Sequence, residues 1–383
     1  MQMYMKFFKS KKGGLMRLVK TFSKIFVLVL FLSFLVWSCS EDSTGPDDEN
    51  GNQLGWAIGG GGSEYGTVLH TEDGGTTWIR QGDSLQFADV DFSDICIMDE
   101  NNLLVVGGPQ PNGNYSVFKS DDGGDTWTTS ASRELANLDY NGIFALDENN
   151  IWIVGEQGSI YYSADAADSW TKLEVPAEYQ QDLFLRIAAK SVDDIWVVGD
   201  QHVGGDYPIM LHTLDGGTNW ERKTPLEDLN LTNALFGHFL GIKVFGNSVW
   251  AIGGPGKFVI RSADNGTTWE DITGSGGYCD ANDIFLLSET EAYMVADYGG
   301  IYSTNDAGVH WTEYYANTNN WVVGLAILDN INLWICGCPG GANEYSEIIY
   351  SPDAGTTWQN QSPQLLIDNP LMGMYKIRFI GDD

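Results

Sequence analysis

The chain is poor in positive charge, histidine and cysteine. Its 383 residues hold 20 Lys and Arg against 52 Asp and Glu, a formal net charge of −32 at pH 7. Such a surface repels nucleic acid and anionic lipid, which excludes nucleic acid as a partner. With five His, five Cys and neither a CxxC nor an HExxH pattern, we expect no metal site. No Gly-rich phosphate loop is recognisable, and we expect no cofactor.

A long hydrophobic run is also missing. The apolar stretch Ile25 to Ser38 has 14 residues, too few to span a bilayer, and it follows a segment with seven basic residues. Because Cys39 comes directly after it, the segment resembles a bacterial lipoprotein signal. The resemblance implies a signal peptide over 1–38, a lipid on Cys39, and an outer-membrane or cell-surface location. An uncleaved helical anchor is the alternative.

Residues 39–54 are rich in Ser, Asp, Glu, Gly, Asn and Pro, and we expect a flexible acidic tether there. Residues 1–38 contain seven basic and no acidic side chains, so the remainder holds 13 basic residues against 52 acidic ones, a net charge of −39. The membrane is therefore expected to be contacted through the lipid alone. This acidity suits cations, basic protein patches or neutral glycans, although it also simply keeps an exported protein soluble.

What the chain does have is a repeat. A turn of the form Ser/Thr-x-Asp-x-Gly-x-Thr-Trp recurs seven times at intervals of 42 to 50 residues, with two degenerate copies. The copies are Thr71–Trp78, Ser120–Trp127, Ser163–Trp170, Thr213–Trp220, Ser262–Trp269, Thr304–Trp311 and Ser351–Trp358. Asp and Gly supply a tight turn, and the Trp anchors the strand that comes after it. A period of this length with strand–turn–strand chemistry predicts a β-propeller.

Each repeat reads as four strands, for example 141–147, 151–155, 159–163 and 170–174. A second aromatic column precedes the turns, at Trp56, Leu104, Trp152, Trp196, Trp250, Tyr293 and Trp334. The segment 374–380 looks like a first strand without a second, and 55–59 like a second without a first. We therefore predict an all-β, seven-bladed propeller over 55–383, with four-stranded blades and the C-terminal strand completing the N-terminal blade.

Four cysteines lie beyond Cys39. Cys336 aligns with a column of Val and Ile, so it is expected in the core. Cys279 and Cys338 fall in loops of adjacent blades on one face, and an exported protein would allow them to form a disulfide. The sequence alone leaves that pairing open.

The loops that join the second and third strands lie on the face opposite the Asp turns, which we call the loop face; the opposite face is the turn face. The loop face is expected to present tyrosines beside polar residues, with Trp321 as the tryptophan of the fold that lies outside the repeat. Residues before and within the first strands are expected at the mouth of the central channel, with Leu240 in the same column as Arg186. The candidate binding residues are Trp321, Tyr298, Tyr207, Tyr345, Tyr115, Tyr65, Asp94 and Arg186. Any one of them also has an ordinary structural explanation.

The seven turns resemble the Asp-box, or BNR, repeats of sialidases, sortilin-type receptors, tandem-propeller xyloglucan hydrolases and photosystem II assembly-factor propellers. Resemblance to the last implies a single ring with one box in each blade. The sequence lacks the Arg-Ile-Pro start and arginine triad expected of a sialidase. It also lacks a visible arginine-rich patch, which counts against a photosynthetic role. The second propeller that a xyloglucan hydrolase of this type would need to form its cleft is missing as well.

The sequence supports two functional hypotheses. The favoured one is a non-catalytic, monomeric, lipid-anchored envelope propeller that recognises or helps to assemble a protein complex, or binds a polysaccharide, through its loop face. The alternative is a carbohydrate-active enzyme that uses a carboxylate pair drawn from Asp139, Asp280, Asp91 and Asp283. Nothing in the sequence singles out one pair, so no catalytic residue is assigned.

Overall fold

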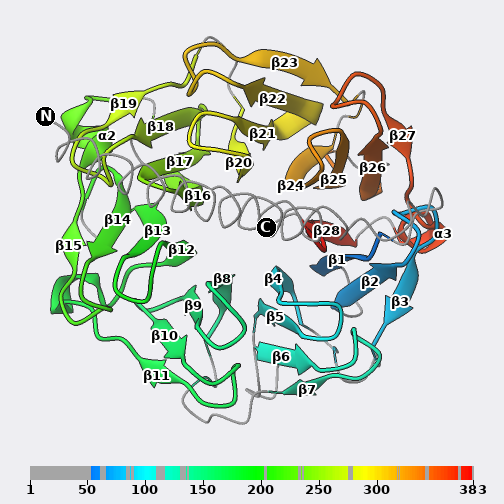
Figure 1. Cartoon of the computed structure of the whole chain (residues 1–383), viewed down its shortest axis with the longest axis horizontal. Coiled ribbons are helices and arrows are strands. Elements are labelled where there is room, and N and C mark those ends of the chain that lie inside the picture. Colours follow the sequence, from blue (N-terminus) through cyan, green and yellow to red (C-terminus); the bar gives the residue numbers. More distant parts are fainter. Residues whose placement is uncertain are drawn as a thin grey trace, which may run out of the picture. The chain divides into compact units, whose positions relative to one another are not determined.

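The computed structural model describes residues 53–60, 66–82, 87, 90–108, 117–129, 135, 138–201, 205–231, 234, 237–274, 279–316, 318, 320–340, 345–369 and 372–381. They form seven four-stranded antiparallel sheets arranged around a common centre, as Figure 1 shows. The predicted all-β seven-bladed propeller is confirmed. The predicted signal peptide, Cys39 and the tether up to residue 52 lie outside the described residues.

The strands of each blade succeed one another from the centre outward (Figure 1). They are β28 (Gly373–Phe379), β1 (Gly55–Gly60), β2 (Thr67–Thr71) and β3 (Ile79–Gln81); β4 (Phe92–Ile97), β5 (Leu103–Gly107), β6 (Val117–Ser120) and β7 (Thr128–Thr129); β8 (Tyr140–Ala145), β9 (Ile151–Gly155), β10 (Ile160–Ser163) and β11 (Thr171–Lys172); β12 (Phe184–Ala189), β13 (Ile195–Gln201), β14 (Pro208–Thr213) and β15 (Glu221–Arg222); β16 (His238–Phe245), β17 (Ser248–Gly254), β18 (Phe258–Ser262) and β19 (Glu270–Asp271); β20 (Ala281–Leu286), β21 (Ala292–Ala296), β22 (Gly300–Thr304) and β23 (Thr312–Tyr315); and β24 (Trp321–Leu328), β25 (Asn332–Cys338), β26 (Glu347–Ser351) and β27 (Gln359–Asn360).

The predicted closure of the ring is present. Strand β28 pairs antiparallel with β1, with Phe379 opposite Gly55 and Arg378 opposite Trp56. The last described strand therefore occupies the innermost position of the blade that the first strand begins. This pairing hides an edge of each strand that would otherwise expose unpaired N–H and C=O groups.

The hydrophobic core lies between blades rather than within one sheet. Each cluster of buried side chains joins residues of two neighbouring blades. The predicted aromatic column supplies its largest members, since the five tryptophans of that column are at most 1% exposed. Burying an indole of roughly 200 Å² contributes up to about 5 kcal/mol. Cys336, predicted to be buried, is 1% exposed.

Two of these tryptophans also bind the turn of the next blade. Trp56 Nε1 donates to the carbonyl of Gly123 at 3.2 Å, and Trp334 Nε1 donates to the carbonyl of Gly74 at 3.1 Å. An indole N–H that is buried needs an acceptor, and here the acceptor belongs to the adjacent blade. These two bonds join the blade of β1 to both of its neighbours, whereas Trp250 Nε1 donates within its own blade, to Ser248 Oγ at 3.1 Å.

All seven Asp-box turns have one hydrogen-bond pattern. In the turn after β6, Asp122 Oδ1 accepts from the Ser120 hydroxyl at 2.9 Å and from the Thr126 amide at 2.8 Å, while Ser120 Oγ accepts from the Gly124 amide at 2.8 Å. Corresponding bonds recur around Asp73, Asp165, Asp215, Asp264, Asp306 and Asp353. These bonds satisfy the backbone of a tight turn, so two strands can reverse within a few residues.

Some details differ from the sequence-based expectation. The outermost strand of the example blade is β11, with two residues, and it is shorter than the predicted 170–174. Short helical segments that the repeat did not predict appear between blades: η2 (Ala177–Tyr179), α2 (Pro225–Asp228) and α3 (Gln364–Asp368). Leu226 and Leu366 of the latter two are at most 1% exposed, so these segments cover the core.

The degenerate turn in the blade of β8 to β11 contains backbone strain that a substitution can remove. Ala166 and Ala167 have φ values of 57° and 67°, in the region that disfavours a Cβ atom. We expect Ala166→Gly to raise the free energy of unfolding by about 0.5–1 kcal/mol, because strain relief exceeds the entropy gained by the unfolded chain. The matched control, Ala145→Gly in β8, should lower it by a similar amount. Denaturant titration measures both; a loss of stability in the Ala166 variant would contradict the interpretation.

The turn carboxylates should make the propeller acid-sensitive. Hydrogen bonds from the Thr268 amide and hydroxyl lower the pKa of Asp264 to about 2, below the roughly 3.9 of a free Asp. Because the folded-state pKa is the lower one, the stabilisation is complete above about pH 4 and is lost as the pH falls through about 2. Asp264→Asn should flatten the dependence of unfolding free energy on pH between 4 and 2, whereas the non-titrating substitution Leu214→Ala should leave it unchanged. Equal slopes in both variants would refute this assignment.

Candidate functional site

The innermost strands share a β-bulge that shapes the mouth of the channel. In every blade the pairing between the first and second strands shifts by one residue at the same place. The extra residues are Ser93, Asn141, Leu185, Leu240, Asn282, Val323 and Tyr375, which we call the bulge ring. A bulge inserts one extra residue, and its side chain leaves the regular alternation between the two faces of the sheet. All seven side chains line a cavity of about 350 Å³ on the loop face.

The bulge ring is chemically two-sided. Leu185, Leu240, Val323 and Tyr375 supply apolar surface, and Ser93, Asn141 and Asn282 supply hydrogen-bonding groups; all seven are half-buried. Asp91, at the edge of the same cavity, is exposed. A shallow cavity with an apolar floor and a few placed polar groups is typical of a binding site for a small part of a larger ligand.

Beside the ring, two exposed aromatic residues come from adjacent blades. Trp321 begins β24 and is 45% exposed. Tyr298 is 52% exposed and lies in η4 (Asp297–Gly299), a turn that packs against β24. Asn282 of the bulge ring connects the two, since its Nδ2 donates to Asp297 Oδ1 at 2.9 Å and to the Val322 carbonyl at 2.8 Å. The structure therefore gathers two predicted binding residues in one part of the loop face.

Carboxylates occur near this mouth, and Asp91 lines the cavity itself. Burial and the nearby Asp91 raise the pKa of Asp139, and burial and the nearby Asp297 raise the pKa of Asp280. His238 Nε2 lies 3.9 Å from Asp280 Oδ2. A carboxylate whose pKa is raised by a second carboxylate gains from an added cation, which would relieve their repulsion.

The other predicted charges lie deeper. Asp94 and Asp283 are 6% and 4% exposed, and each uses its carboxylate to join two blades. Asp94 accepts from the Ile95 amide of its own blade at 3.1 Å and from the Ile143 amide of the next at 3.2 Å. Asp283 accepts in the same way from Ile284 at 3.1 Å and Leu325 at 3.3 Å. These two carboxylates are committed to the backbone inside the channel, not displayed at its mouth.

Basic side chains accompany them. Lys376 Nζ lies 3.0 Å from Asp283 Oδ2, and Arg378 Nη1 lies 3.5 Å from the same oxygen. Lys376 is 2% exposed. Although burial disfavours the ionised form of Asp283, Lys376 and Arg378 hold the pKa of its carboxyl well below the usual range. A deeply buried, ionised Asp held by Lys and Arg is suited to holding blades together.

The sequence placed the channel column imperfectly. The structure pairs Arg186 with Val198, as the alignment implied, but it is Gly241, not Leu240, that pairs with Ile252. A bulge has no sequence signal comparable to a Trp column, so one-residue errors were to be expected.

The remaining candidates are more embedded or lie elsewhere. Tyr207 is half-buried against the cluster between the blades of β12 and β16, and Tyr345 is half-buried. Tyr65 and Tyr115 lie outside the described residues. Cys279 and Cys338 are free thiols, so the disulfide that the sequence allowed is absent. Among the described residues there is no group of three metal-ligating side chains and no helix long and apolar enough to cross a bilayer.

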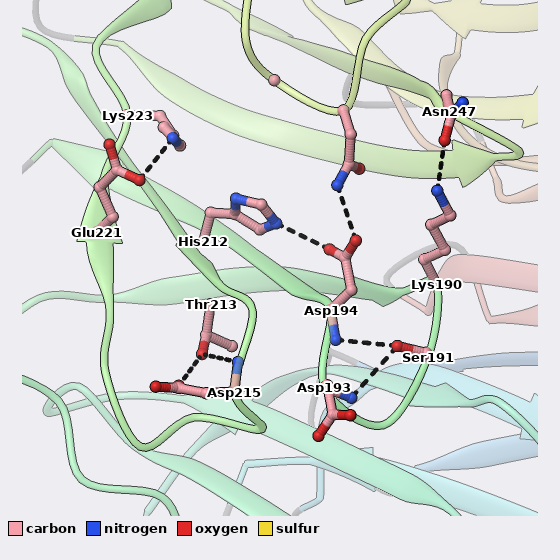
Figure 2. A network of polar contacts seen from close by, with 12 residues as sticks. Lys190, Ser191, Asp193, Asp194, His212, Thr213, Asp215, Glu221, Lys223 and Asn247 are labelled. Carbon is pink, nitrogen blue, oxygen red and sulfur yellow. Dashed lines mark hydrogen bonds and ion pairs between the residues drawn. The ribbon is translucent and has the colours of Figure 1, made fainter.

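A second polar network lies on the turn-face side, between the blades of β12 and β16 (Figure 2). His212 Nε2 lies 2.8 Å from Asp194 Oδ1, and the His212 ring stacks on Trp196 with ring centroids 3.7 Å apart. Asn265 of the next blade donates to Asp194 Oδ2 at 2.7 Å. The neighbouring Thr213 hydroxyl takes part in its Asp-box turn. Because Asn265 of the next blade completes the network, we interpret it as a contact between blades.

These observations define the chain as a single seven-bladed Asp-box propeller with a shaped channel mouth. The sequence pattern described as "Photosynthesis system II assembly factor YCF48" matches residues 49–178 and 169–330, together well over half of the chain. The protein belongs to this family, and the predicted resemblance to photosystem II assembly-factor propellers is confirmed.

Individual relatives are more distant. The photosystem II stability/assembly factor HCF136 of Arabidopsis thaliana is 30% identical over 156 residues, which is 39% of this chain and 36% of that protein. The Oryza sativa counterpart is 27% identical over 155 residues, 39% and 34% of the two chains. The matched part thus spans about a third of the length of these curated relatives.

Solved structures agree on the fold. YCF48 bound to D1 peptide superposes with a TM-score of 0.54 at 17% identity, covering 75% of this chain and 89% of that one. YCF48 from Cyanidioschyzon merolae gives 0.55 at 18% identity, covering 72% and 85%. An ancestral GH74 enzyme gives 0.52 at 12% identity, covering 82% and 46%. At these identities the likeness concerns architecture alone.

The buried ion pair in the channel should be strongly coupled. We expect Lys376→Met to lower the free energy of unfolding by about 3 kcal/mol, because it leaves Asp283 buried with one cation fewer. Asp283→Asn should cost a similar amount. The double variant should cost clearly less than the sum of the two, and denaturant titration of all four proteins measures the coupling. Additive losses would show that the two side chains act independently.

Proposed function

We propose that the protein is a non-catalytic recognition or assembly propeller that binds a segment of a partner protein at the loop-face mouth of its channel. The observation that carries the proposal is the bulge ring, which turns seven side chains into one cavity of about 350 Å³. A scaffold that needed only a closed ring would require no such cavity. Membership in an assembly-factor family and the solved complex of YCF48 with a D1 peptide support a protein partner.

The chemistry of the mouth favours a particular kind of segment. Asp139 and Asp280 each have a raised pKa beside a second carboxylate, so a Lys or Arg side chain placed there would relieve repulsion. Leu240 and Val323 offer apolar contact, and Trp321 and Tyr298 offer exposed aromatic faces nearby. Aromatic anchors near a cavity are common energetic centres of protein interfaces. We infer a partner segment that carries both basic and apolar side chains.

The setting of this function is inferred from the N-terminus. A signal peptide over 1–38, a lipid on Cys39 and a tether over 39–54 would hold a monomeric propeller at the outer membrane or cell surface. A partner in an envelope protein complex would then be met close to the membrane. A strongly acidic surface would increase the association rate with a basic segment.

A carbohydrate-active enzyme is the second candidate. It is favoured by one observation, the raised pKa of Asp139 and of Asp280, because a general acid of a glycosidase needs a carboxyl group that stays protonated near neutral pH. The exposed Trp321 would also suit a sugar ring. Asp283 is a weaker candidate for this role, since it is buried and paired with Lys376.

Peptide binding tests the first candidate. The probes are two libraries of 12-residue peptides that are matched in apolar content, one rich in Lys and Arg and the other in Asp and Glu. We expect the basic library alone to yield binders, and Trp321→Ala to weaken them by tenfold or more. The matched control is Leu214→Ala, which removes a side chain 66% exposed in a turn-face loop and should have no effect. Equal binding of the acidic library, or an equal loss in the control, would contradict the proposal.

The enzyme alternative needs a separate assay. The chain is incubated with plant and microbial polysaccharides, and new reducing ends are measured. Release of ends that is abolished by Asp139→Asn or Asp280→Asn would replace the binding proposal with a hydrolase. Polysaccharide sedimentation without new ends, lost in Trp321→Ala, would change the partner from protein to glycan.

A further inference from the structure

The channel contains a second cavity, which shares Arg186 with the lining of the loop-face mouth. It has a volume of about 280 Å³ and lies toward the turn face, at the far ends of the innermost strands. Its wall includes the basic residues Arg186, Lys243, Lys376 and Arg378, set among isoleucines of β4, β8, β12, β16 and β20. Apolar walls strengthen the field of charges that they enclose.

The charges of this lining are unevenly placed. Its four basic side chains are buried or half-buried, whereas only two of its four carboxylates, Asp94 and Asp283, are buried. Each carboxylate already accepts two backbone amides, so less of its charge is available to the cations. Asp147 and Glu148 also line the cavity, but they are exposed at the turn-face end and bind Asn149 and Asn150.

The basic groups repel one another. Burial, Arg186 and Arg378 lower the pKa of Lys376 to about 8, and the favourable effect of Asp283 does not cancel theirs. Arg186 donates Nη1 to the carbonyls of Asn141 and Leu185, each at 2.7 Å. Its Nε is buried and has no hydrogen-bond partner among the described residues. Buried guanidinium N–H groups without an acceptor are costly, and an anion would supply one.

Glycines provide the space for these side chains. A Cβ atom on Gly324 would lie 3.1 Å from the Cα of Lys376, and one on Gly142 would lie 3.2 Å from the Cα of Arg186. In both places the glycine of one blade lies against the backbone that carries the charge of the next. Gly241 occupies the same position of β16 and lines the cavity. The long basic side chains therefore converge on an open centre.

We propose that this cavity binds a small oxyanion, either a tetrahedral inorganic anion or a short carboxylate, between Arg186, Lys243, Lys376 and Arg378. At roughly 30 Å³ for a water molecule, the cavity has room for such an anion with part of its hydration shell. Asp147 and Glu148 at the outer end disfavour large polyanions, so the site selects small ones. This site differs from the one proposed for the partner segment on the loop face, although Arg186 lines both cavities.

Binding is tested on the full chain with two probes, sodium sulfate and sodium succinate, each compared with sodium chloride at equal ionic strength. Isothermal titration calorimetry measures the Kd and thermal unfolding measures the shift in Tm. We expect at least one probe to bind and to raise the Tm above the chloride value. Sulfate alone would indicate a tetrahedral anion, and succinate alone a carboxylate.

Lys243→Gln identifies the site. Among the described residues Lys243 has no hydrogen bond or ion pair through its side chain, so its replacement should leave the fold intact while weakening binding about tenfold. The matched control, Lys172→Gln on the exposed strand β11, should bind as the unchanged protein does. The proposal is overturned if neither probe binds the unchanged protein, or if Lys243→Gln and Lys172→Gln bind equally well.

Discussion

The antiparallel pairing of β28 with β1 is the constraint on which the propeller depends. It brings the two ends of the folded chain into one sheet and leaves no blade without an inner strand. Because the hydrophobic clusters lie between blades, each of them requires both neighbours to be in place. Opening this one pairing would expose apolar surface on both sides of the junction and would remove Lys376 and Arg378 from the channel.

The sequence predicted the scaffold well because the scaffold repeats. Trp152 and its equivalents recur at fixed positions, and each turn of the Ser120–Asp122 type satisfies its own hydrogen bonds locally. Seven copies of the same pattern therefore predict the same blade seven times. The channel was harder to predict. Leu240 is expected in the column of Arg186, but a bulge intervenes and Gly241 occupies that position. Asp94 is expected to bind a ligand, whereas its buried carboxylate links two blades.

The proposed binding residues lie where the repeat is broken. Trp321 is the tryptophan of the fold outside both aromatic columns, and it lies beside the mouth with Tyr298 of the neighbouring blade. The two cavities of the channel differ in how their charges are placed. Carboxylates whose pKa is raised lie near the loop-face mouth, whereas the turn-face cavity holds four basic side chains together with four carboxylates. The two ends of one channel therefore present different chemistry.

The number of blades is odd, and this affects the order of residues around the innermost ring. Passing from blade to blade, the first residue after each bulge reads Asp94, Gly142, Arg186, Gly241, Asp283, Gly324 and Lys376. Charged residues and glycines alternate until the circuit closes, where Lys376 and Asp94 become neighbours. The seven sectors of this inner ring are therefore not equivalent, because one junction alone brings two charged residues together without a glycine between them. A nearly symmetric ring in this way acquires one sector that differs from all the others.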